Sequence, residues 1–271
     1  PILSNWVPRP GYVELRAGYN QYNSTQGTAP VESLLVYRSG GAEKMFAAAD
    51  SHIYDISTNS TAASVLTGLS SARWQYVNFT PANGTTVIQL VNGTDTLRQF
   101  DGTNWTTPSI TGGPATSSFI NINAQKRRLW YVQNNSTVAW YMPTDAITGP
   151  VAGSQDCGAL WTKGGVMIAM FPWTVDGGTG PQDYACFLSS RGQISMFSGT
   201  DPTNANVWAL VGTFDISPPI GRRCFTRVGS DVALITEAGV IPISQVLPFD
   251  PSADRSVAIT ARIQNAMNLA S

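Results

Sequence analysis

The feature that most constrains this chain is a repeated pattern of two short apolar runs on either side of a small polar turn. Five copies run from KMFAAADSHIYDI, which begins at residue 44, to VALITEAGVIPIS, which begins at residue 232. Their turns fall 42 to 57 residues apart, near Ser51, Gly93, Asn135, Gly192 and Gly239. Several turns hold Asn-Gly, Arg-Gly or Ala-Gly, which supply the positive φ angles that tight hairpins require. The pattern predicts five antiparallel hairpins.

Further strand-like runs stand before and after these hairpins. The runs before them are SLLVYR, WQYVNF, FININA, VMIAMF and CFTRVG, and looser runs such as SVLTGL, TTPSI and WALVGTF follow. Four strands per unit at a period in the forties is typical of a β-propeller blade. We therefore expect an all-β fold, with residues 1–249 forming a β-propeller of about five or more four-stranded blades. A β-sandwich is the alternative, because it too is built from short strands at regular spacing.

One motif occurs twice, as FDGTNW from Phe100 and as FSGTDPTNANVW from Phe197. Each copy has an aromatic residue, one small residue or aspartate, Gly-Thr, and then a Trp that opens another apolar run. Its place after the third run predicts a turn into the outer strand of a blade. We expect Trp105 and Trp208 to cover the next sheet.

The N-terminal residues 1–19 are expected to form an arm or closing strand. Tyr12 to Ala17 alternate in the manner of a strand, and we expect them to pair with a strand distant in sequence, on the same chain or a neighbour. Prolines cannot join a central ladder, so the preceding WVPRPG is expected to be an extended arm or turn. Trp6 is expected to anchor this arm in an apolar pocket.

The C-terminal residues 250–271 have a different pattern. Val257, Ile259, Ile263 and Met267 roughly follow helical spacing, and Ser252 can cap a helix N-terminus. We expect a short helix here, leading into a continuation of the chain.

The composition offers little for catalysis. His52 is the single histidine, and the three cysteines are too widely spaced for a zinc knuckle. The acidic residues lie at or near turns, where Asp is common for conformational reasons. We predict no catalytic, cofactor-binding or metal-binding residues, and no enzymatic activity. The longest apolar run, residues 165–171, is far shorter than the ~20 residues that span a bilayer.

Two basic clusters precede or begin apolar strands: one ends in Arg127 and Arg128, and the other is Arg222 and Arg223. These four arginines are candidate contacts to another subunit or to DNA phosphate. Trp6 is a candidate contact to another subunit. The alternative for the arginines is a solvated strand edge that deters pairing between sheets.

Beyond these patterns, an ordered set of short motifs runs through the chain from NWVPRPGYVELRAGY through RWQYVNF, FDGTNW, NAQKRRLWYV and GRRCF to ITEAGVIPIS. The set spans residues 5–244 and resembles the tail hub or nozzle proteins of short-tailed bacteriophages, sometimes described as packaged-DNA-stabilising proteins. The resemblance implies a structural β-propeller protein of the virion tail.

In that family, subunits form a homo-oligomeric ring, usually a hexamer, beneath the portal and adaptor proteins. The ring surrounds the channel through which DNA passes without sequence specificity. A net charge of −1 suits such a channel, because many Lys or Arg contacts to phosphate would hold DNA tightly. The alternative function is a glycan-binding or glycan-cleaving propeller, in which Trp105, Trp130, Trp140, Trp173 and Trp208 would stack on sugar rings.

Overall fold

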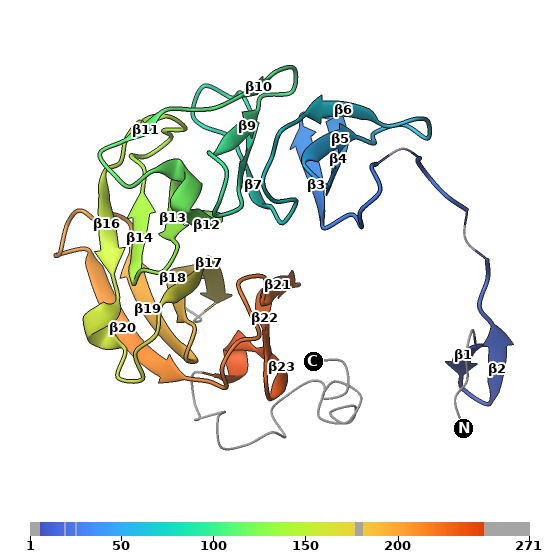
Figure 1. Ribbon diagram of the computed structural model, residues 1–271. Helices are drawn as coiled ribbons and strands as arrows, with labels where there is room; N and C mark the ends of the chain where they lie inside the picture. The colour runs from blue at the N-terminus through green and yellow to red at the C-terminus, as the bar shows by residue number, and fades with distance from the viewer. Residues whose placement is uncertain (1–5, 19, 25, 177–180, 247–271) are drawn as a thin grey trace.

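The computed structural model describes residues 6–18, 20–24, 26–176 and 181–246. Within these ranges the chain is all-β, and five antiparallel sheets follow one another around a common axis (Figure 1). The predicted β-propeller is confirmed, and the β-sandwich alternative is wrong. The helix expected within residues 250–271 lies outside the described residues.

Each blade is an antiparallel sheet whose strands follow in sequence from the axis outward. Blade 1 holds β3 (Ser33–Ser39), β4 (Ala42–Ala49), β5 (His52–Asp55) and β6 (Ala63–Leu66). Blade 2 holds β7 (Gln75–Phe79), β8 (Val87–Val91), β9 (Arg98–Phe100) and β10 (Trp105–Thr106). Blade 3 holds β12 (Phe119–Gln125), β13 (Arg128–Gln133), β14 (Val138–Tyr141) and β16 (Gly153–Asp156).

Blade 4 has the longest strands, β17 (Met167–Asp176), β18 (Pro181–Ser189), β19 (Gln193–Gly199) and β20 (Trp208–Asp215). Blade 5 has three strands among the described residues, β21 (Phe225–Val228), β22 (Asp231–Thr236) and β23 (Gly239–Pro242). A short parallel pair, β11 (Ile110–Thr111) and β15 (Gly149–Pro150), lies outside the blades. Three 3₁₀ turns complete the described elements: η1 (Thr116–Ser118), η2 (Gly158–Leu160) and η3 (Ile243–Gln245).

Hydrophobic clusters lie between successive blades. Leu35 and Phe46 of blade 1 pack with Ile88 and Leu90 of blade 2, and three further clusters join blades 2 and 3, 3 and 4, and 4 and 5. A middle strand is therefore covered on both faces, and all five residues of β8 are buried. This two-sided burial explains why apolar residues predominate on both faces of β8. Apolar area removed from water is the main stabilising term of the stack.

The repeated Phe-x-Gly-Thr motif forms the predicted turn from the third strand to the outer strand. Trp105 begins β10, and its ring centroid lies 5.0 Å from that of Phe46 in blade 1. Trp208 begins β20 and stacks at 5.9 Å on Trp130 of blade 3. Each Trp therefore covers the preceding blade, whereas we expected it to cover the next one.

The N-terminal arm differs from expectation. β2 (Tyr12–Leu15) pairs with β1 (Trp6–Arg9) in a local two-stranded hairpin, so the predicted pairing with a distant strand of the same chain is wrong. Pro8 is aligned with Val13, which is allowed because both strands of a two-stranded sheet are edges. Figure 1 shows the hairpin standing apart from the blades at the end of an extended segment. Trp6 is 41% exposed and is not anchored in a pocket.

Candidate functional site: an axial pocket and its polar network

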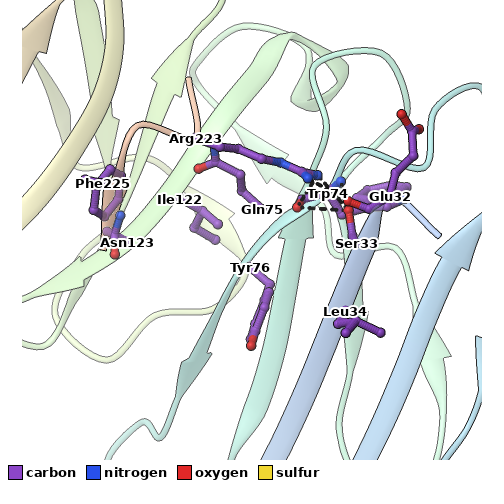
Figure 2. Close-up of a pocket in the computed structure, with 10 residues that line it drawn as sticks. All are labelled: Glu32, Ser33, Leu34, Trp74, Gln75, Tyr76, Ile122, Asn123, Arg223 and Phe225. Carbon is purple, nitrogen blue, oxygen red and sulfur yellow. Dashed lines mark hydrogen bonds between the residues drawn. The ribbon is translucent and has the colours of Figure 1, made fainter. Parts of the chain in front are cut away.

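A pocket of about 320 Å³ lies where the first strands of several blades converge (Figure 2). Its walls come from β3, β7, β12 and β21 and from the residues just before them. The lining residues are Glu32, Ser33, Leu34, Trp74, Gln75, Tyr76, Ile122, Asn123, Arg223 and Phe225. Since the first strand of each blade lies nearest the axis, the pocket occupies one end of the propeller axis.

Arg223 crosses this end of the propeller. Its Nη1 donates to the carbonyl oxygen of Glu32 at 2.7 Å, and its Nη2 donates to Ser33 Oγ at 2.6 Å and to the carbonyl oxygen of Trp74 at 2.9 Å. Burial, with Arg73 as the next contributor, lowers the pKa of Arg223, although a guanidinium remains protonated in proteins. These hydrogen bonds connect the loop before blade 5 to blades 1 and 2.

Arg222 uses its donors in the same way. Its Nη1 donates to the carbonyl oxygen of Asn92 at 2.7 Å and its Nη2 to that of Arg73 at 3.1 Å. Burial again comes first among the influences that lower the pKa of Arg222. Gln75 Nε2 in turn donates to the Arg222 carbonyl oxygen at 2.7 Å. Both arginines thus bind backbone groups of their own chain.

From Gln75 the hydrogen bonds continue into blades 3 and 4. Asn121 Nδ2 donates to Gln75 Oε1, and Asn121 Oδ1 accepts the backbone N–H of Met170 at 3.0 Å. Asn123 Nδ2 donates to the Met170 carbonyl oxygen at 2.7 Å. Together with the arginines, these side chains join all five blades at the axis, and we call this set the axial network. Gln75, Asn121 and Asn123 were not among the predicted site residues, and their only sequence signal is a polar residue in an otherwise apolar run.

The other predicted basic cluster lies elsewhere. Lys126 and Arg127 form the turn after β12, whereas Arg222 and Arg223 precede β21, so the two clusters lie at opposite ends of the first strands. Arg128 Nη2 lies 3.0 Å from Asp201 Oδ1 of blade 4, with only 12% of the Arg128 side chain exposed. Arg127 is 58% exposed and pairs with Asp145. All four candidate arginines therefore have partners within the chain, and no single basic patch unites them.

The axial pocket offers hydrogen-bonding groups and one carboxylate. Among the described residues that line it, Glu32 is the only acidic one, and none is a histidine or a cysteine. His52 lies in blade 1, with Nδ1 3.2 Å from Ser51 Oγ and its ring stacked on Tyr54. In the ranges that the structure describes, no group of three His, Cys, Asp or Glu side chains could hold a metal ion. Most of the polar groups in its lining, including the Arg223 guanidinium, Ser33 Oγ and the Gln75 amide, already bind partners within the chain.

The tryptophans proposed to stack on sugars lie mostly in the core. Trp130, Trp173 and Trp208 are 0%, 4% and 8% exposed, and each packs between blades. Trp105 and Trp140 are partly buried, and Trp140 Nε1 donates to Gln133 Oε1 at 2.9 Å. Trp130, Trp173 and Trp208 are therefore too buried to stack on a sugar ring, as the glycan-binding alternative requires.

No helix within the described part of the chain combines the length and apolar character needed to cross a membrane. The sequence matches no known protein family and no curated protein.

Solved structures do resemble it. One is BBS1N in complex with ARL6DN, with a TM-score of 0.50 at 12% identity, over 86% of this chain and 67% of that one. Another is a protein from Bacteroides uniformis proposed to be a 6-phosphogluconolactonase, with a TM-score of 0.50 at 12% identity, over 76% and 64% of the two chains. The chain thus spans about two thirds of the length of these structures. Both are propellers, and at this identity the likeness shows the fold alone: the chain is a β-propeller.

Proposed function

We propose that this chain is a structural subunit of a bacteriophage tail, a hub or nozzle protein that assembles with copies of itself into a ring around the DNA exit channel. The observation that carries the proposal is the N-terminal hairpin. It stands apart from the propeller (Figure 1), and no strand of the described blades pairs with it.

The hairpin has one apolar face. Trp6 is aligned with Leu15, and Val13 lies two residues from Leu15, so alternation places the three on one side. They are 41%, 69% and 44% exposed. The other side carries the Arg9–Glu14 ion pair at 2.7 Å. A lone two-stranded hairpin is at best marginally stable in water, so an apolar face held outside the fold points to a partner that covers it.

The assignment to a phage tail rests on the ordered motifs between residues 5 and 244. The hexameric ring, the portal, adaptor and other tail partners, and the location in the virion are proposed on the same resemblance. The basic side chains are compatible with DNA that slides without sequence specificity. Arg222, Arg223 and Arg128 use their donors within the chain, which leaves fewer guanidinium N–H groups free to bind phosphate.

Electron microscopy and mass photometry of the purified full chain test the assembly. We expect a closed ring of six copies, and we expect mass spectrometry to detect the chain in purified virions of the phage that encodes it. A well-folded chain that stays monomeric at micromolar concentration would contradict the ring, and its absence from virions would contradict the tail role.

A further inference from the structure

Among the described residues, blade 1 packs against a neighbouring blade with one face only. Leu35 and Phe46 pack against blade 2, so alternation turns Leu34, Met45 and Ala47 to the opposite side. Blade 5 packs on blade 4 and reaches blade 1 through the loop that carries Arg223. The uncovered face belongs to the first blade of the arc (Figure 1).

Part of this face is covered by the segment that leads into blade 1. Asn23 Nδ2 donates to the Thr58 carbonyl oxygen at 2.9 Å, and Ser24 forms a parallel bridge with Thr61. Beside this segment a groove of about 600 Å³ remains open. Apolar groups predominate in its lining, which consists of Tyr22, Asn23, Gln26, Val31, Glu32, Ser33, Leu34, Ala47 and Ile56. Leu34 and Val31 are 58% and 44% exposed.

The same chain therefore holds an apolar groove and, on a tether, an apolar hairpin face. We propose that the β1–β2 hairpin of one copy docks into the blade 1 groove of the next copy. The occupant is a second copy of this chain, and the inference rests on the ring proposed above. A groove of 600 Å³ lies within the ~300–1,000 Å³ range of pockets that take small ligands, so it has room for the Trp6 indole.

Six residues lie between Leu15 and Tyr22, where the segment that carries the hairpin joins blade 1. An extended chain spans about 3.3 Å per residue, so this free part of the tether reaches about 23 Å from blade 1 toward a neighbouring copy. The hairpin in this structure is held away from the blades rather than against its own groove (Figure 1).

The arrangement also sets the symmetry of the assembly. The hairpin and the groove are different surfaces, so each copy donates one and accepts one. Such head-to-tail contacts generate a ring where the rotation between copies closes, and a filament where it does not. Docking buries Leu15, Trp6 and Leu34 together, and apolar area removed from water drives association.

Cysteine cross-linking tests the contact in the full chain. One variant carries Leu15→Cys and a second carries Leu34→Cys, while Cys157, Cys186 and Cys224 are buried and do not compete. After the two variants are mixed and oxidised, we expect a covalent dimer that neither forms alone. The matched control pairs Leu15→Cys with Leu210→Cys, a 43% exposed position on β20. Equal dimer yield from the control pair would overturn the proposal, as would an internal cross-link within a single chain that carries both substitutions.

Substitution on either face of the hairpin gives a second measurement. Leu15→Ser should raise the concentration at half-assembly by about tenfold or more, whereas Tyr12→Ser, on the opposite face, should leave it within about twofold. If wild type forms rings, but Leu15→Ser does not weaken them and no specific cross-link appears, the docking proposal is wrong while the proposed ring is supported. If wild type is monomeric, both fail.

Discussion

Arg223 and Trp74 are 149 residues apart in the sequence, yet Nη2 of Arg223 donates to the carbonyl oxygen of Trp74 at 2.9 Å. The same guanidinium reaches Glu32 and Ser33 at the start of blade 1. The first and last of the described blades are therefore connected at the axis by hydrogen bonds from the Arg223 side chain.

Arg223→Lys should destabilise the fold. Lysine keeps the charge but presents a single ammonium, which cannot reproduce the fork that reaches Glu32, Ser33 and Trp74. We expect the free energy of unfolding, measured by urea denaturation, to fall by about 1–3 kcal/mol. Arg127→Lys is the matched control, because Arg127 is 58% exposed and its ion pair with Asp145 lies at the surface. It should change stability by less than ~0.5 kcal/mol. Equal losses in the two variants would contradict a role for Arg223 in joining the blades.

Gly199→Ala tests the repeated turn motif. Gly199 has φ +134°, and a Cβ there would lie 1.9 Å from the Val207 carbonyl oxygen. The alanine must therefore displace backbone at the turn that delivers Trp208 to its place. We expect a loss of at least about 2 kcal/mol in the free energy of unfolding. Gly18→Ala is the control, since nothing lies within 4 Å of a Cβ there. A Gly199→Ala protein as stable as the control would show that the turn adapts freely.

Asp95 gives the fold an acid-sensitive contact between blades 1 and 2. Burial tends to raise the pKa of Asp95, but hydrogen bonds from Asn92 and from the backbone N–H groups of Ser70 and Ser71 outweigh it and lower the pKa. A carboxyl group whose pKa is lower in the folded state than in the unfolded state stabilises the fold fully when the pH is above its unfolded pKa. This contribution is lost as the pH falls below about 4 through the folded pKa.

Asp95→Asn should therefore be less stable than wild type at pH 7, by about 1–2 kcal/mol, with the difference shrinking toward pH 3. Urea denaturation of both proteins from pH 3 to 7 measures it. Glu43→Gln serves for comparison, because Glu43 is 64% exposed in a surface ion pair with Arg38. A difference that stays constant over the whole pH range would show that Asp95 does not act through its charge.

The three native thiols should be unreactive in the folded protein. Burial, with Asp156 nearby, raises the pKa of Cys157 to about 12, and burial also raises the pKa of Cys224 to about 12 and that of Cys186. Since the thiolate is the reactive form, a disulfide reagent at pH 8 should react at least about 100-fold more slowly than with free cysteine. All three should react in denaturant. One rapid equivalent in native wild type would contradict this, whereas Leu34→Cys should add one.

The parts of the fold that the sequence predicted are those set by local chemistry. The turns near Ser51, Gly93, Asn135, Gly192 and Gly239 all join the second and third strands of their blades. In each turn a glycine, an asparagine or, in blade 1, Asp50 takes the positive φ that the turn requires. The run before each hairpin proved to be the first strand of its blade.

The parts that were missed depend on contacts between distant residues. The outer strand of blade 3, Gly153–Asp156, has the sequence GSQD, and half of it is exposed, so no apolar alternation marks it. The axial network joins residues from five blades, and nothing in the local sequence of Gln75 or Asn121 tells which groups they bind. The hairpin was missed because the prolines argued against a strand, although an edge strand tolerates them.

The position of Arg222 and Arg223 late in the sequence has a consequence for synthesis. Blades 1 to 4 are complete before residue 216, so a growing chain can stack them one after another through contacts between neighbours. Arg222 and Arg223, which bind Asn92, Glu32 and Ser33, are synthesised only afterwards. Their hydrogen bonds close loops of 130 to 191 residues. The entropic cost of closing a loop rises only slowly with its length, so closing these long loops costs little more free energy than closing shorter ones would.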